Sequence, residues 1–171
     1  EHRFLSMNSA AFFNNRGEVE RIVNSIEDIT ERVEAKRASE RALRALKVTN
    51  EGLRSLMNAD TIEEYLEEIC DIAVNIGGYA LAWFGLANQD ESKSVDTIAI
   101  SSKGAAYIDE IEITWDDSPL GMGPTGMAIK NQTAVKTEDI QYETDYSPWR
   151  NTALKHGFRS SIAIPFVFDS N

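Results

Sequence analysis

The hydrophobic and polar positions divide the chain into three stretches with different periodicities. Residues 3–14 and 19–29 are strand-like and flank the turn-forming run 14–17, a pattern that predicts a β-hairpin. Residues 31–57 lack proline and are rich in Ala, Glu, Arg, Lys and Leu, which predicts one long helix. Residues 58–171 mix helical and strand-like periods and predict a second folded region.

The predicted long helix carries a heptad pattern in its second half. Leu43, Leu46, Asn50 and Leu53 follow in steps of three and four residues, the a and d spacing of a two-stranded coiled coil. An asparagine at an a position costs stability but fixes the register of a parallel dimer. We therefore predict a homodimer through this helix. The alternative is a monomeric linker helix whose leucines lie on the domain that follows.

The pattern of residues 58–171 predicts an α+β fold, an antiparallel sheet flanked by helices. Strands are expected at residues 79–87, 95–101, 111–115 and 158–168. Helices are expected at residues 58–75, 127–130 and 147–156. Asp60 or Thr61 is the expected N-cap of the first helix, and Ser147 that of the last. Residues 79–87 are apolar on both faces, which favours a strand covered on each side.

Charge is distributed unevenly and narrows the possible partners. Residues 1–57 carry 10 basic and 9 acidic side chains, whereas residues 58–171 carry 7 basic and 19 acidic ones. An acidic second half argues against binding to nucleic acid or to an anionic membrane. No apolar run approaches the roughly 20 residues that span a bilayer. With a single cysteine, Cys70, the chain is expected to be cytoplasmic.

Residues 1–30 form only two predicted strands, too few for a stable domain of their own. They resemble the C-terminal end of PAS domains, in which a strand leads into an Asp-x-Thr motif and then a signalling helix. Asp28 and Thr30 match that motif. The resemblance implies that they fix the angle between strand and helix. The alternative is an ordinary helix start in which Thr30 is the N-cap. Residues 1–30 are thus interpreted as a truncated PAS-like domain and 31–57 as its signalling helix.

Three motifs in residues 58–171 resemble the GAF domain, in the form found between PAS domains and cyclase or kinase outputs. They are Gly-Tyr-Ala-Leu-Ala-Trp-Phe-Gly at 78–85, Gly-x-Gly-Pro-Thr-Gly-Met-Ala-Ile at 121–129, and a Ser-Pro-Trp-Arg motif that runs from 147 to Pro165. The resemblance implies a sensor domain whose C-terminal end is missing. It also implies an output domain, a histidine kinase or a diguanylate cyclase, outside this chain.

Aromatic side chains suggest where a ligand would bind. In GAF-like folds the cavity lies between the sheet and the helices that cover one face. Trp83, Trp115 and Trp149 are candidates to line it, with Met122 at its mouth. The alternative is that these side chains simply fill the space. A small-molecule ligand is therefore possible, and no cofactor is identified.

The remaining polar groups do not form a recognisable catalytic or metal site. The glycine segment 121–126 is either a tight packing turn or an anion site at the start of a helix. Cys70 is expected to be a buried structural thiol, and His156 the cap of a helix. The clustered carboxylates have no calcium-loop spacing: Asp116, Asp117, Glu138 and Asp139.

These patterns predict a sensory and relay module of a bacterial signalling protein. It would bind a small ligand or a neighbouring domain and pass the change through a dimeric helix. The alternatives are a structural dimerisation spacer without a ligand and, less favoured, a redox enzyme built on the GAF fold.

Overall fold

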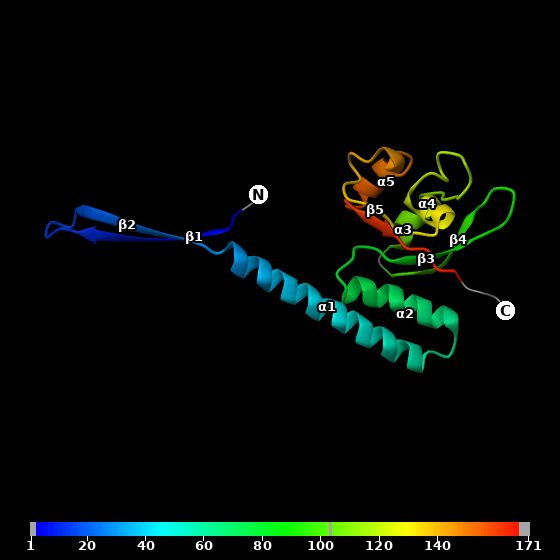
Figure 1. The fold of residues 1–171 in the computed structure, drawn as a ribbon, viewed down its shortest axis with the longest axis horizontal. Coiled ribbons are helices and arrows are strands. Elements are labelled where there is room, and N and C mark those ends of the chain that lie inside the picture. The colour runs from blue at the N-terminus through cyan, green and yellow to red at the C-terminus, as the bar shows by residue number, and fades with distance from the viewer. Residues whose placement is uncertain (1–2, 103, 168–171) are drawn as a thin grey trace. The chain divides into compact units, whose positions relative to one another are not determined.

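A computed structural model describes residues 3–102 and 104–167, and the chain divides into two compact units, Glu1–Lys47 and Val48–Asn171 (Figure 1). The first unit opens with the antiparallel strands β1 (Leu5–Phe13) and β2 (Val19–Asp28). The turn between them is closed by the Asn14 side chain, which accepts from the N–H groups of Arg16 and Glu18. The predicted hairpin is confirmed.

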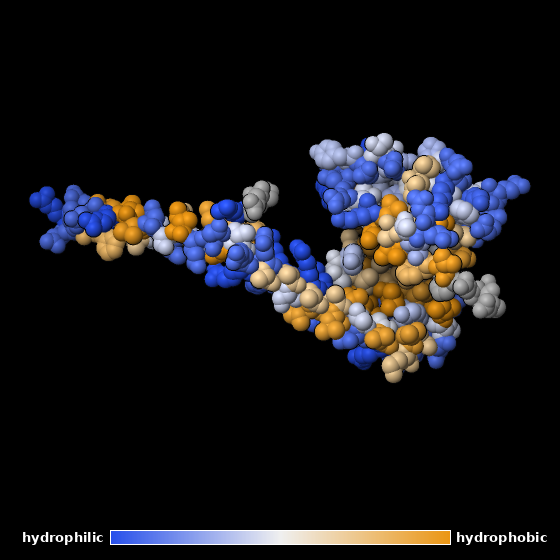
Figure 2. All heavy atoms as spheres, viewed as in Figure 1, coloured by the Kyte–Doolittle hydropathy of each residue, from blue (hydrophilic) through white to orange (hydrophobic). Residues whose placement is uncertain are grey.

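The hairpin carries apolar side chains that nothing in its own unit covers. Met7 pairs with Ile26 and Ala11 pairs with Ile22, so these side chains share one face of the ribbon. Both Met7 and Ile22 are at least 60% exposed. Figure 2 shows apolar residues in orange along the visible face of this ribbon. A two-stranded ribbon of this kind needs a further layer to be stable in water.

The predicted long helix is confirmed as α1 (Thr30–Asn58), which runs without a break. Its start differs from the expected one. Thr30 is the first helical residue, and its hydroxyl accepts from the N–H of Phe4 rather than capping the helix. Asp28 Oδ1 accepts from the N–H of Thr30 and so satisfies a donor of the first turn. The expected N-cap role of Thr30 is therefore wrong.

The second unit contains α2 (Ile62–Asn75), two pairs of strands and several short helices. Thr61 caps α2, since its hydroxyl accepts from the N–H of Glu64, while the Glu64 carboxylate accepts from the N–H of Asp60. This reciprocal arrangement is a capping box, and it selects Thr61 from the two expected caps. Helix α2 packs on β3 (Trp83–Ala87) and β4 (Val95–Ile100), which pair antiparallel.

Strand β3 begins four residues later than predicted. Residues 111–115 do not form the predicted strand. A single β-bridge pairs Thr114 with Ser94, the residue just before β4. The carbonyl of Glu112 accepts from the indole of Trp149 instead, which removes it from strand pairing. The last pair is β5 (Val135–Thr137) with β6 (Ser161–Ala163). Of the predicted strand 158–168 only β6 forms. Pro165, which lacks an N–H, lies just beyond its end and limits its extension there. Residue 168 lies outside the described residues.

The short helices connect these strands and carry most of the core. They are α3 (Ala105–Ile108), α4 (Pro124–Asn131), the 3-10 helix η1 (Thr144–Tyr146) and α5 (Arg150–Lys155). Helix α5 starts later than predicted, at Arg150, and residues 147–149 form turns before it. Its N-cap is Trp149, so the expected cap at Ser147 is wrong. The buried cluster joins α3, η1 and α5: Tyr107, Ile140, Tyr146, Trp149 and Ala153.

Within residues 3–102 and 104–167, none of the helices has an apolar stretch long enough to cross a membrane. The mixed helix and strand architecture agrees with the predicted α+β class, preceded by a hairpin and a long helix. The coiled-coil pairing of α1 stays a prediction.

Candidate functional site

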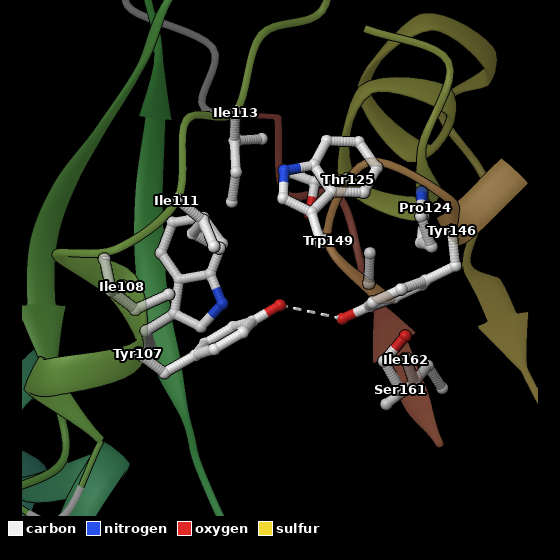
Figure 3. Close-up of a pocket in the computed structure, with 12 residues that line it drawn as sticks. Tyr107, Ile108, Ile111, Ile113, Pro124, Thr125, Tyr146, Trp149, Ser161 and Ile162 are labelled. Atoms are coloured by element: carbon white, nitrogen blue, oxygen red, sulfur yellow. Dashed lines mark hydrogen bonds between the residues drawn. The ribbon is translucent and has the colours of Figure 1, made fainter. Parts of the chain in front are cut away.

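A small cavity of about 70 Å³ lies between α3, α5 and the strand β6 (Figure 3). Its walls are mainly aliphatic and aromatic, and the polar side chains among them are uncharged. The lining residues are Trp83, Tyr107, Ile108, Ile111, Ile113, Pro124, Thr125, Tyr146, Trp149, Ser161, Ile162 and Ala163. The predicted Trp83 and Trp149 both line this cavity.

Trp149 forms one wall, and three contacts hold its indole in place. Its Nε1–H donates to the carbonyl of Glu112 at 2.7 Å. Its ring lies against Gly123, where an added Cβ would overlap with the indole atoms. The ring of Tyr146 meets the indole edge-on at 5.8 Å between centroids. The glycine segment therefore shapes the cavity wall.

Two tyrosine hydroxyl groups meet inside the buried cluster. The Oη atoms of Tyr107 and Tyr146 are 3.1 Å apart and share one hydrogen bond, drawn as a dashed line in Figure 3. Burial raises the pKa of Tyr107 above its usual range, and the hydrogen bond to Tyr146 adds to the shift. Tyr107 therefore stays protonated at physiological pH. One O–H donates to the other oxygen, so the pair keeps one free donor.

The hydroxyl of Ser161, on β6, is the unusual group of the lining. Its Oγ is buried and has no hydrogen-bond partner among the residues that the structure describes. Leaving a buried donor unpaired costs roughly 1–3 kcal/mol. Neither Ser161 nor Tyr107 was predicted from the sequence to be a site residue. A serine at the start of a continuous apolar run gives no local signal that its hydroxyl is buried.

Two other predicted site residues lie away from this cavity. Trp115 donates its indole N–H to the carbonyl of Asn88 at 2.8 Å, and Lys93 lies 3.8 Å over its ring. Met122 is 44% exposed, with its sulfur 3.6 Å from Lys130 Nζ. Neither residue lines the cavity.

The glycine segment behaves as a packing turn. A Cβ on Gly121 would overlap with the backbone of Asp116, and one on Gly126 with the backbone of Gly121. Lys130 reaches across the turn to the carbonyl of Asp116 and the carboxylate of Asp117. These contacts favour the packing interpretation over an anion site.

The contacts of His156, Cys70 and the acidic residues favour structural roles over catalytic or metal-binding ones. His156 is the C-cap of α5, and its Nε2 lies 3.3 Å from the Glu110 carboxylate. Cys70 is buried on α2, and burial raises the pKa of its thiol to about 11. In the described part of the chain, no three His, Cys, Asp or Glu side chains gather as a metal site would require.

The Asp28-Ile29-Thr30 segment joins the base of the hairpin to the start of α1. Thr30 Oγ1 accepts from the N–H of Phe4 at 2.9 Å, and the N–H of Ile29 donates to the Phe4 carbonyl at 2.9 Å. Asp28 also lies 3.4 Å from the guanidinium of Arg3. The hydrogen bonds from Thr30 lower the pKa of Asp28. The motif therefore ties both strands to the first helical turn.

The predicted relay leucines are exposed on one face of α1. Leu43 and Leu46 are each 57% exposed and Leu53 is 55% exposed, and Asn50 is exposed as well. At 100° per residue, this face points roughly 170° away from the face of Gly52 and Ser55.

The opposite face of α1 packs on α2. Gly52 and Ser55 are its buried residues. The hydroxyl of Ser55 donates to the carboxylate of Glu68, and Gly52 faces the side chain of Ile69. Leu53, which belongs to the same unit as α2, is therefore exposed rather than packed on that helix.

The second unit is a mixed helix and strand domain with a small cavity among its short helices. A family model described as the GAF domain matches residues 59–171, and the chain belongs to this family. GAF domains are common sensory and regulatory domains of signalling proteins.

One solved structure is similar to this chain. The structure is described as the crystal structure of the A. aeolicus nlh2 GAF domain in an inactive state. It shares 15% identity with this chain at a TM-score of 0.49, and the match covers 63% of this chain and 60% of that one. No curated protein matches. The PAS interpretation of residues 1–30 stays a prediction.

Proposed function

We propose that the chain is a sensory and relay module of a bacterial signal-transduction protein. Its GAF domain takes a small ligand in the cavity, and α1 pairs in parallel with α1 of a second copy. A shift in the GAF domain then changes the helix pair, which acts on an output domain such as a histidine kinase or a diguanylate cyclase. The chain itself has no catalytic role in this proposal.

The exposed leucine face of α1 carries the proposal. Leu43, Leu46 and Leu53 leave apolar surface in water on a helix whose other face is already packed. Pairing with a second copy would bury this surface, at about 25 cal/mol per Å². Asn50 at an a position would keep the pair parallel and in register, because two asparagines at that level can hydrogen-bond each other.

The contacts between the hairpin and α1 support the relay. The Thr30 hydroxyl accepts from the N–H of Phe4, and the Asp28 carboxylate accepts from the N–H of Thr30. A movement of the strands would therefore reach the first turn of α1 directly. We therefore propose that the hairpin is the end of a PAS-like sensor domain. The exposed apolar face of its strands supports this, because a sensor core would cover it.

The small size of the cavity favours a second candidate function, a dimerisation spacer without a ligand. A volume of about 70 Å³ is far below the roughly 300–1,000 Å³ of pockets for drug-sized ligands. In that case Trp83 and Trp149 would fill the space as core residues. The two candidates share the dimer and differ only in whether the cavity is occupied.

Light scattering of the purified chain at tens of micromolar tests the dimer. We expect a dimer for the wild type and a monomer for Leu46→Glu, because a carboxylate in the apolar seam is costly to bury. The matched control Ala38→Glu, outside the seam, stays dimeric. Asn50→Leu changes the register or the oligomeric state. A monomeric wild type would contradict the proposal.

A further inference from the structure

We propose that the cavity of the GAF domain takes a small neutral molecule with a carbonyl oxygen, such as a primary amide. The oxygen accepts hydrogen bonds from Ser161 and from the free hydroxyl of the Tyr107–Tyr146 pair. This inference rests on the proposed function, which places a ligand in this cavity, and it adds the chemical class of that ligand.

The hydroxyl groups of the lining have donors that a ligand acceptor could pair with. Ser161 Oγ is buried without a partner among the described residues. The Tyr107–Tyr146 pair uses one of its two hydrogens between its own oxygens, which leaves one O–H to donate. A carbonyl oxygen has two lone pairs and no hydrogen, so it can accept from both groups. Such a ligand would satisfy the donor that the protein leaves unpaired.

The charge of the surroundings excludes anions. Among the described residues that line the cavity there is no Lys, Arg or His. The nearby cations are engaged elsewhere: Lys130 and Lys155 bind carboxylates, and Arg150 donates to backbone carbonyls. A buried carboxylate or phosphate would therefore have no counter-ion, which is strongly unfavourable. A neutral carbonyl has the same acceptor without that penalty.

The volume limits the ligand to a few non-hydrogen atoms. The cavity holds about 70 Å³, above the roughly 10–15 Å³ that one water molecule requires and far below the roughly 300–1,000 Å³ of pockets for drug-sized ligands. Acetamide has a planar body of this order of size, and its methyl group suits the aliphatic walls of Ile108 and Ile111. Acetate has nearly the same shape but carries a charge, so the two molecules form a matched pair of probes.

Titration of the full chain, labelled with ¹⁵N, tests the inference through the indole N–H signals of its three tryptophans. We expect acetamide to shift the signals of Trp83 and Trp149 in a saturable way. Trp115 lies away from the cavity and serves as an internal reference. Acetate should need at least tenfold higher concentrations for the same shift.

Variants assign the contact to the hydroxyl groups. Ser161→Ala is expected to raise the half-saturating concentration of acetamide about fivefold, the effect of one lost hydrogen bond. The neighbouring exposed Ser160→Ala leaves it unchanged. Without acetamide, Ser161→Ala is expected to be at least as stable as the wild type, because it removes an unpaired buried donor. This measurement shows that any loss of binding is not a loss of folding.

The outcomes separate this inference from the proposed function. Equal responses to acetate and acetamide, or an unchanged response of Ser161→Ala, overturn the ligand class while ligand sensing stands. No shift with either probe overturns both the ligand class and a ligand of this size, and favours the spacer. Selective binding of acetamide by a monomer overturns the dimeric relay but leaves the ligand class intact.

Discussion

Single residues decide the geometry of the cavity wall. Gly123 has no side chain, and this allows the six-membered ring of the Trp149 indole to lie against the backbone before α4. The same indole donates to the carbonyl of Glu112, 37 residues earlier in the chain. One aromatic ring therefore links three segments that the sequence keeps apart.

Gly123→Ala is expected to destabilise the GAF domain by about 1–3 kcal/mol, because the added methyl group forces the indole away. Urea unfolding monitored by tryptophan fluorescence measures this change. Gly52→Ala is the matched control. There the new Cβ lies 3.1 Å from the flexible end of Ile69, and the helix gains roughly 1 kcal/mol from alanine. Equal losses in the two variants would contradict the role of Gly123.

Residue roles were predictable where the signal is local. The cap at Thr61 follows from the residues beside it, and Cys70 is buried on the apolar side of its helix, as expected. Trp115 looked like a cavity residue, but Asn88 and Lys93 hold it elsewhere. The burial of Ser161 also depends on partners far along the chain. Such long-range contacts leave no pattern in a single sequence.

At the scale of elements, α3 and α5 are joined by an ion cluster around Glu110. Its carboxylate lies 2.9 Å from Lys155 Nζ and 3.3 Å from His156 Nε2. The ring of His156 also packs edge-on against Tyr107, which lines the cavity. The cluster therefore holds together the two helices that supply the tyrosine and tryptophan walls.

Acid is expected to loosen this connection. The hydrogen bond from Lys155 first, and then that from His156, lower the pKa of Glu110 from 4.5. Because the folded pKa is the lower one, the stabilisation is complete above pH 4.5 and is lost as the pH falls through the folded value. Wild type should exceed Glu110→Gln in thermal stability at pH 7, and the difference should shrink steadily as the pH falls below 4.5. A difference that persists in acid would contradict this assignment.

The junction between β2 and α1 gives a second test at this scale. Thr30→Val keeps the shape of the side chain but removes the oxygen that accepts from Phe4. The amide of Phe4 is then expected to exchange with deuterium several-fold faster, by loss of one hydrogen bond. Thr30→Ser keeps the oxygen and should preserve slow exchange. Equal protection in both variants would show that the hydroxyl does not hold the junction.

Elements with a strong local pattern were predicted well, and those that depend on pairing were not. The hairpin and α1 follow from turn residues and helix formers alone. Residues 111–115 have the alternation of a strand, yet the Glu112 carbonyl bonds to Trp149. There a tertiary contact overrides the local preference. Residues 147–149 form turns, so α5 begins only at Arg150.

At the scale of the whole molecule, the chain combines a sensor domain with a helix that has two separate faces. One face, at Gly52 and Ser55, packs on α2 of the GAF domain. The other, at Leu43 and Leu46, is open to a partner. In the proposed relay, a helix packed on one side and paired on the other would transmit a small rotation from the domain to the dimer. A few kcal/mol of differential ligand affinity are enough to shift such an equilibrium.

Disulfide cross-linking tests the parallel helix pair most directly. In a Cys70→Ala background, a cysteine introduced by Leu46→Cys faces its own copy across a parallel seam, within the roughly 7 Å between Cα atoms that a disulfide allows. Arg41→Cys, on the opposite side of the helix, is the control. We expect mild oxidation to convert most of Leu46→Cys to a covalent dimer and to leave Arg41→Cys monomeric on denaturing gels. Equal cross-linking of both variants, or none in Leu46→Cys, would contradict the account.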